Sequence, residues 1–115
     1  MNPLVEITRA PGGDFVVARL NGEIDMKSAP RIHAALARAV SNAALGLVVD
    51  LSAVSYLDSA GMRLLFDLER ELQYHRQHLR LVVPEGAPIQ RVVEIVNLGE
   101  HIALHSTLAT ALEGP

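Results

Sequence analysis

The stretch that most constrains the fold is residues 46–72, where a β-prone run leads into a strongly periodic segment. Leu47, Val48 and Val49 do not alternate with polar residues, which is typical of a strand at a sheet centre or covered on both faces. The mixed residues 51–57 are expected to form a loop. A helix is predicted from about residue 59 towards 78, because apolar side chains recur on one face at Leu64, Leu65, Leu68 and Leu72.

The same patterns place the other elements around this block. Two β-prone segments separated by a Pro-Gly-Gly turn predict an antiparallel hairpin at the N-terminal end. The expected elements are strands at 4–8 and 15–20, a turn at 10–14, a polar loop at 21–25, a helix capped by Ser28, strands at 46–50 and 79–83, a helix at 89–96, a strand at 102–104 and a last helix capped by Ser106 or Thr107. This ββαβαβαβα order predicts one α/β domain over residues 1–115 with a mostly parallel mixed sheet.

Composition excludes several classes of function. The 115 residues carry a formal net charge of −3 without a basic run and with few aromatics, which argues against nucleic-acid binding and against an anionic membrane surface. There is no cysteine, so disulfides and thiolate chemistry are excluded. No apolar run is long enough to span a bilayer, and the first ten residues do not resemble a signal peptide, so we expect a cytoplasmic protein.

No catalytic or metal-binding pattern stands out. Ser59 lacks the G-x-S-x-G context of a hydrolase, and spacing pairs none of the five histidines with it. His75 and His78, like His101 and His105, lack a third ligand nearby. The glycines do not form a phosphate-binding loop. We therefore expect a protein that is not an enzyme and uses no cofactor or metal.

The pair Asp58-Ser59 has two interpretations. Either residue could cap the following helix by accepting a backbone N–H, with Gly61 allowing close packing. Alternatively, Ser59 is a modification site, because a phosphate there would be stabilised by the helix N-terminus and would add nearly two negative charges beside Asp58. Arg63, four residues along, could reach such a phosphate or form an exposed ion pair with Asp67.

Two methionines, Met26 and Met62, fall at the two junctions between loop and helix. Exposed methionines would suit an interface with a partner, whereas buried ones would only fill gaps in the core. The sequence leaves both interpretations open.

Three segments resemble the STAS domain family, named for sulfate transporters and anti-sigma factor antagonists. They are VVDL at 48–51 followed by YLDSAG at 56–61, LNGEID at 20–25, and VVEIVNLG at 92–99. The resemblance covers nearly the whole chain in order, and it implies the same ββαβαβαβα fold.

The resemblance also implies a function. Small stand-alone members are bacterial anti-sigma factor antagonists. They bind an anti-sigma factor, a GHKL-type serine kinase, so that the sigma factor is released. The kinase then phosphorylates the antagonist, and a phosphatase resets the switch. Carried over to this chain, Ser59 is the phosphoacceptor, and the expected partner-binding residues are Asp25, Ser28, Asp58, Ser59, Ala60, Gly61, Met62 and Arg63.

The chain departs from the family pattern at two of these positions. Ala60 stands where Ser or Thr is frequent, which leaves Ser59 as the single acceptor in the motif. Arg63 stands where a small residue is common, which bears on the identity of the partner. Two alternatives remain: a constitutive subunit of a transporter or signalling assembly with Ser59 only a helix cap, and a sensor of a small molecule or nucleotide using the same loop. The oligomeric state is left open.

Overall fold

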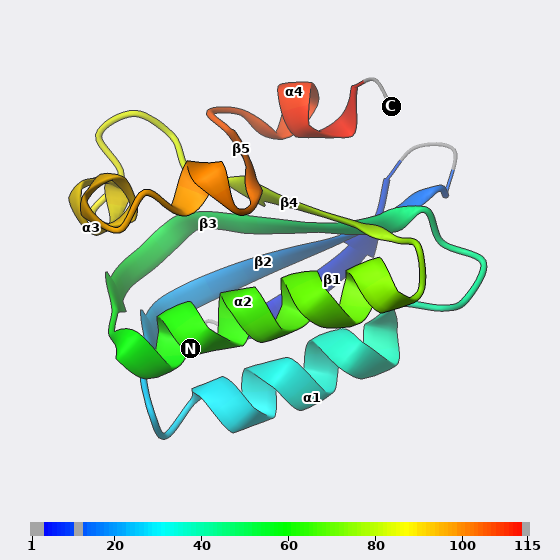
Figure 1. The fold of residues 1–115 in the computed structure, drawn as a ribbon, viewed down its shortest axis with the longest axis horizontal. Helices are drawn as coiled ribbons and strands as arrows, with labels where there is room; N and C mark the ends of the chain where they lie inside the picture. Colours follow the sequence, from blue (N-terminus) through cyan, green and yellow to red (C-terminus); the bar gives the residue numbers. More distant parts are fainter. Residues whose placement is uncertain (1–3, 11–12, 114–115) are drawn as a thin grey trace.

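The computed structural model describes residues 4–10 and 13–113 (Figure 1). The element order is ββαβαβαβα, as predicted, with one added 3-10 helix. The elements are β1 (Val5–Arg9), β2 (Phe15–Ile24), α1 (Ala29–Ala39), β3 (Gly46–Leu57), α2 (Ser59–Tyr74), β4 (His78–Val82), α3 (Gln90–Ile95), η1 (Leu98–Glu100), β5 (Ala103–His105) and α4 (Leu108–Leu112).

The strands form one five-stranded sheet in the order β1-β2-β3-β4-β5. β1 pairs antiparallel with β2, and the other neighbouring pairs are parallel. The predicted hairpin and the central place of β3 are thus confirmed. Of the predicted turn, Pro11 and Gly12 lie outside the described residues, while Gly13 has φ +76°, a conformation that glycine adopts readily.

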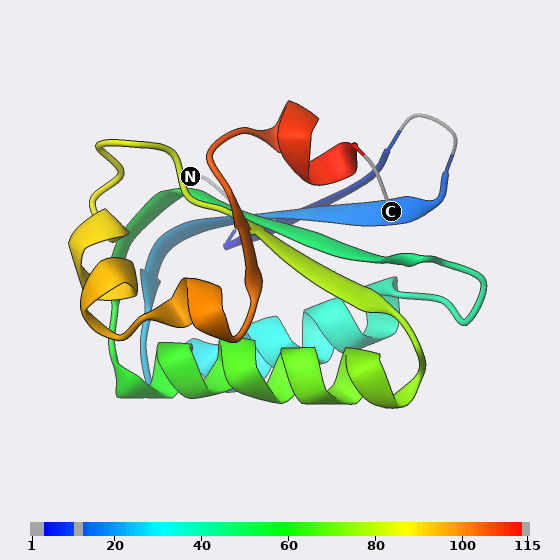
Figure 2. The same cartoon turned by 45° about the horizontal axis from the view of Figure 1, so that its top comes forward.

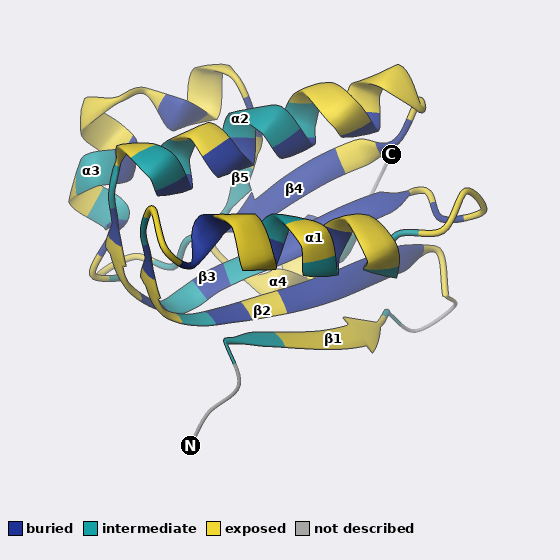
Figure 3. Ribbon diagram, turned by 90° about the horizontal axis from the view of Figure 1, so that it is seen from below, coloured by how far each residue is buried: buried dark blue, intermediate teal, exposed yellow. Residues whose placement is uncertain are grey.

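Helices cover both faces of the sheet. α1 and α2 lie side by side on one face and α4 lies on the other (Figure 2). Along β2, alternate side chains enter two clusters: Val16, Ala18 and Leu20 face α1 and α2, whereas Phe15 and Val17 face α4. Figure 3 shows the consequence for α1 and α2, whose exposed residues lie on the sides turned away from the sheet.

Two strands extend further than predicted. β2 includes residues 21–24 and β3 includes residues 51–57, which were both expected to be loops. The register between these strands shifts between Arg19 and Asn21 and again between Gly22 and Glu23. Such irregularities break the period-two pattern, so that Leu51, Val54 and Leu57 are all buried at a spacing of three.

Helix ends also differ from the prediction. α2 ends at Tyr74, because Arg76 takes a left-handed conformation with φ 59°. Asn97, also left-handed, separates α3 from η1. At α4 the cap is Thr107 rather than Ser106, with Oγ1 of Thr107 accepting the Thr110 N–H at 3.1 Å. No helix in the described part of the chain is both long and apolar enough to cross a membrane.

Candidate docking site at the start of α2

Two neighbouring parallel strands end at the same edge of the sheet. Ile24, the last residue of β2, is in register with Leu57, the last of β3. The backbone N–H of Asp58 donates to the carbonyl of Ile24 at 3.2 Å. The loop that begins with Asp25 and the start of α2 are therefore held together, at the carboxyl edge where parallel sheets commonly place their sites (Figure 1).

Asp58, not Ser59, caps α2. Its Oδ1 accepts the backbone N–H of Gly61 at 3.0 Å, and its own backbone is extended. Ser59 is the first helical residue and is exposed, and within the described chain no group hydrogen-bonds to its hydroxyl. Of the two predicted caps Asp58 is confirmed, and the alternative that makes Ser59 only a helix cap is wrong on this point.

The loop at Asp25 is tied by its own side chains. Oδ1 of Asp25 accepts the backbone N–H groups of Lys27 and Ser28, both at 3.0 Å. The hydroxyl of Ser28 accepts the N–H of Asp25 at 2.9 Å and donates to the carbonyl of Glu23 at 3.1 Å. The backbone N–H of Ser28, followed by its hydroxyl and the Lys27 N–H, lowers the pKa of Asp25 below its ordinary value against the opposing effect of desolvation.

Ser28 precedes α1 as predicted, but its side chain does not cap the helix. The hydroxyl is engaged within the loop instead, because Ser side chains readily bond to nearby backbone. Ser28 is only 6% exposed, so its place is inside the loop rather than on the surface.

The remaining predicted residues divide by burial. Gly61 is buried, and a Cβ there would meet the backbone oxygen of Ile24 at 2.8 Å, which confirms the close-packing interpretation. Met62 is half-buried against the core, whereas Met26 is 76% exposed. One methionine therefore fills the core and the other is a surface residue.

Arg63 is exposed, but the predicted pair with Asp67 is wrong. Asp67 accepts instead from Arg70, at 2.5 Å. Among the described residues no acidic side chain pairs with Arg63, so its guanidinium is available at the surface.

A hollow of about 350 Å³ adjoins this edge between the first turns of α1 and α2. Ala60 and Arg63 of α2 line it together with Met26. Sequence reasoning missed the α1 side of the hollow, formed by Ala29, Pro30 and His33. No sequence signal could have found it, because the hollow depends on how the two helices pack.

Within residues 4–10 and 13–113 no three His, Asp or Glu side chains cluster in a way that could hold a metal. The edge offers instead an exposed hydroxyl, two carboxylates occupied by backbone N–H groups, an exposed Met and an exposed Arg. This arrangement suits protein docking.

Comparisons with known proteins agree with the geometry. Residues 5–111 match the model of the STAS domain. The anti-sigma-F factor antagonist RsfB of Mycobacterium tuberculosis is 31% identical over 111 residues, which cover 96% of this chain and 88% of RsfB. The structure resembles an anti-sigma factor antagonist from Mycobacterium paratuberculosis with a TM-score of 0.78 and 29% identity, over 94% of this chain and 91% of that one.

A more distant structure shares the fold alone. The Bacillus cell fate determinant SpoIIAA in its phosphorylated form has a TM-score of 0.65 and 24% identity, covering 94% of this chain and 96% of that one. Family model, relatives and topology coincide over nearly the whole described chain, and the protein belongs to the STAS domain family.

Proposed function

We propose that this protein is a cytoplasmic anti-sigma factor antagonist that acts by binding, and that phosphorylation of Ser59 controls the binding. Its partner is an anti-sigma factor that is also a GHKL-type serine kinase, and a phosphatase restores the unmodified form. RsfB, which is named an anti-sigma-F factor antagonist, supports the general assignment.

One observation supports Ser59 as the switch: its hydroxyl is exposed while the neighbouring Asp58 already caps the helix. A kinase could therefore modify Ser59 without removing a hydrogen bond that holds α2. The phosphate would meet the free N–H groups of the first turn, which favour an anion.

The docking surface would comprise Met26 and Arg63 with the accessible parts of Asp25, Asp58, Ser59, Ala60 and Met62. Ser28 and Gly61, both buried, would shape this surface from below. A phosphate adds nearly two negative charges next to Asp58. A partner seated there would have to desolvate those charges, so its dissociation would become faster.

The test compares Ser59→Ala with Ser59→Asp in binding to the anti-sigma kinases of the source organism. The Ala variant should bind like the wild type, because Ser59 makes no structural hydrogen bond. The Asp variant should bind at least about tenfold more weakly, since 1.4 kcal/mol of repulsion suffices for that factor. Ser106→Asp adds the same charge at an exposed serine beside α4 and should leave binding unchanged.

The constitutive-subunit alternative makes the opposite prediction. It requires that Ser59→Ala and Ser59→Asp bind a partner equally and that no kinase phosphorylates the chain. That pair of results would reject the switch.

A further inference from the structure

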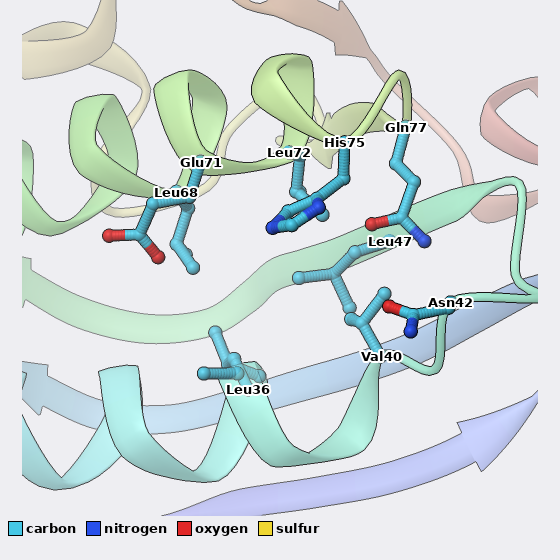
Figure 4. Close-up of a pocket in the computed structure, with 10 residues that line it drawn as sticks. Leu36, Val40, Asn42, Leu47, Leu68, Glu71, Leu72, His75 and Gln77 are labelled. Carbon is cyan, nitrogen blue, oxygen red and sulfur yellow. The ribbon is translucent and has the colours of Figure 1, made fainter.

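A second cavity lies at the opposite end of the two long helices. It has a volume of about 230 Å³, is partly open to solvent and is lined by the C-terminal halves of α1 and α2 and the start of β3 (Figure 4). Leu36, Leu47 and Leu72 give it an apolar interior. Glu71, His75 and Gln77 bring polar groups to its wall, and the function proposed above uses none of them.

Gln77 is held in one orientation. It is only 9% exposed, and its Nε2 donates to the carbonyls of Ser41 at 2.9 Å and Ala44 at 3.0 Å. Because both neighbours are acceptors, the amide nitrogen has to face them, and the oxygen Oε1 has to face the other way. Figure 4 shows this oxygen turned to the side of the cavity where His75 and Leu47 lie.

Oε1 of Gln77 is a hydrogen-bond acceptor that a bound molecule could use. No group in the described part of the chain donates to Oε1 of Gln77, although the rest of the side chain is fixed and nearly buried. Oε1 is a fixed acceptor on the cavity wall, so a molecule that brings an N–H or O–H into the cavity can donate to it.

The charge at the cavity mouth favours a cation. Glu71 is the acidic residue of the lining, and no Lys or Arg of the described chain lines the cavity. Its carboxylate accepts from Nε2 of His33 at 2.9 and 3.0 Å, but a carboxylate has about four lone-pair sites and can accept further bonds.

We propose that this cavity binds a small aliphatic primary amine in its ammonium form. The alkyl chain would lie among the leucines, and the ammonium would donate to Oε1 of Gln77, while the negative charge of Glu71 on the same cavity lining favours a cation. A cavity of about 150 Å³ can hold benzene, so the 230 Å³ here suits a somewhat longer molecule of the size of hexylammonium. The site lies at the C-terminal end of α2, whereas Ser59 is the first residue of that helix, so the proposal does not depend on the switch.

The test is an amide NMR titration of the full chain with hexylamine hydrochloride at pH 7. We expect saturable shifts confined to the ends of α1 and α2 and the start of β3. Hexanoate, which has a similar chain but a negative head and no donor, should bind at least about tenfold more weakly. Equal affinity for the two probes would overturn the assignment.

Matched variants locate the site. Val40→Phe fills the cavity and should abolish the shifts, whereas Val92→Phe places the same substitution in a separate hollow beside α3 and should not. Glu71→Gln, at an exposed position that does not endanger the fold, should weaken hexylammonium binding about fivefold and leave hexanoate no weaker. Absent shifts with the wild type, or undiminished binding by Val40→Phe and Glu71→Gln, would refute the proposal.

Discussion

At the scale of single residues, Asp58 and Ser59 are adjacent but have separate tasks. Asp58 accepts the Gly61 N–H, and Ser59 contributes no hydrogen bond to the described structure. Asp58→Ala should therefore lower the free energy of unfolding by about 1 kcal/mol, as measured by urea denaturation. Asp58→Asn keeps an acceptor oxygen and should therefore retain most of the stability that Asp58→Ala loses. A loss for Ser59→Ala as large as that for Asp58→Ala would contradict this division.

Gly61 is required by a close approach of backbone. A Cβ at this position would lie 2.4 Å from Cδ1 of Leu57 and 2.8 Å from the backbone oxygen of Ile24. Alanine normally improves a helix by about 1 kcal/mol over glycine, but overpacking here should outweigh that gain. We expect Gly61→Ala to destabilise the protein by about 1–3 kcal/mol and to shift the amide signals of Ile24 and Asp58. A more stable variant would show that α2 can move away from β2.

Glu69 of α2 is the carboxyl whose pKa is raised, chiefly by burial and in spite of His78 and Gln73. Its Oε2 is buried without a hydrogen bond in the described structure. Since the pKa of Glu69 is raised in the folded protein, its protonated form favours folding over its charged form. The free energy of unfolding is therefore highest below the ordinary pKa of a Glu side chain, and it falls as pH rises through the folded-state pKa. Glu69→Gln should hence raise the urea midpoint at pH 7, and the difference should vanish in acid.

Residue types indicated which side chains could gather at this edge of the sheet, but not the hydrogen-bond partner of each side chain. The capping choice between Asp58 and Ser59 depends on backbone angles that no spacing reveals. Ser28 has the composition of a helix cap, yet its hydroxyl bonds to Asp25 and Glu23. The pair of Arg63 and Asp67 has favourable spacing, but Arg70 offers Asp67 an alternative. Such competition is decided by local geometry.

At the scale of elements, apolar periodicity predicted the helices, and the uninterrupted run at residues 47–49 predicted the central strand. Apolar periodicity did not predict the extensions of β2 and β3, because register shifts there break the alternation of buried and exposed residues. Two consecutive exposed residues, Ser55 and Tyr56, then give the segment the sequence pattern of a loop although it belongs to a strand. A bulged strand at the edge of a site therefore carries little sequence signal.

How α4 is attached to the sheet could not be predicted from the sequence either, because the attachment depends on a buried cation. Arg80 of β4 is 5% exposed, its Nη1 donates to the carbonyl of Ala111 at 2.7 Å, and its guanidinium lies 4.5 Å from the centre of the Phe15 ring. Arg80→Met should remove the charged hydrogen bond, leave a helix-end carbonyl unsatisfied and destabilise the protein by about 2 kcal/mol.

Hydrogen exchange should locate that effect, with protection lost first at residues 108–112. Arg80→Lys is the control for charge alone. It should not restore the protection, because an ammonium group lacks the planar guanidinium that reaches the carbonyls of Ala111 and Glu113 and also lies over the Phe15 ring. Full protection in Arg80→Met would show that α4 is held by Ala111 and its apolar neighbours without the cation.

At the scale of the whole molecule, the predicted order of strands and helices is consistent with the loop at Asp25 and the start of α2 lying at one edge of the sheet, because parallel strands end on the same side. The hollow beside Ala60 and Arg63 and the cavity beside Gln77 were not predictable. Both arise between α1 and α2, whose relative placement depends on packing over the sheet. Segment patterns determine which faces are buried, but not the gaps left between them.

This arrangement separates the proposed switch from the stability of the domain. Ser59 lies at the first turn of α2, outside the core, and a phosphate there would interact favourably with the helix dipole while being repelled by Asp58. We therefore expect the free energy of unfolding of the phosphorylated protein, and of Ser59→Asp, to lie within about 1 kcal/mol of the wild-type value. Amide shifts should remain near residues 24–28 and 58–63. Loss of binding accompanied by global unfolding would mean that the modification acts by disrupting the fold, whereas loss of binding by an intact fold would place the effect at the docking surface itself.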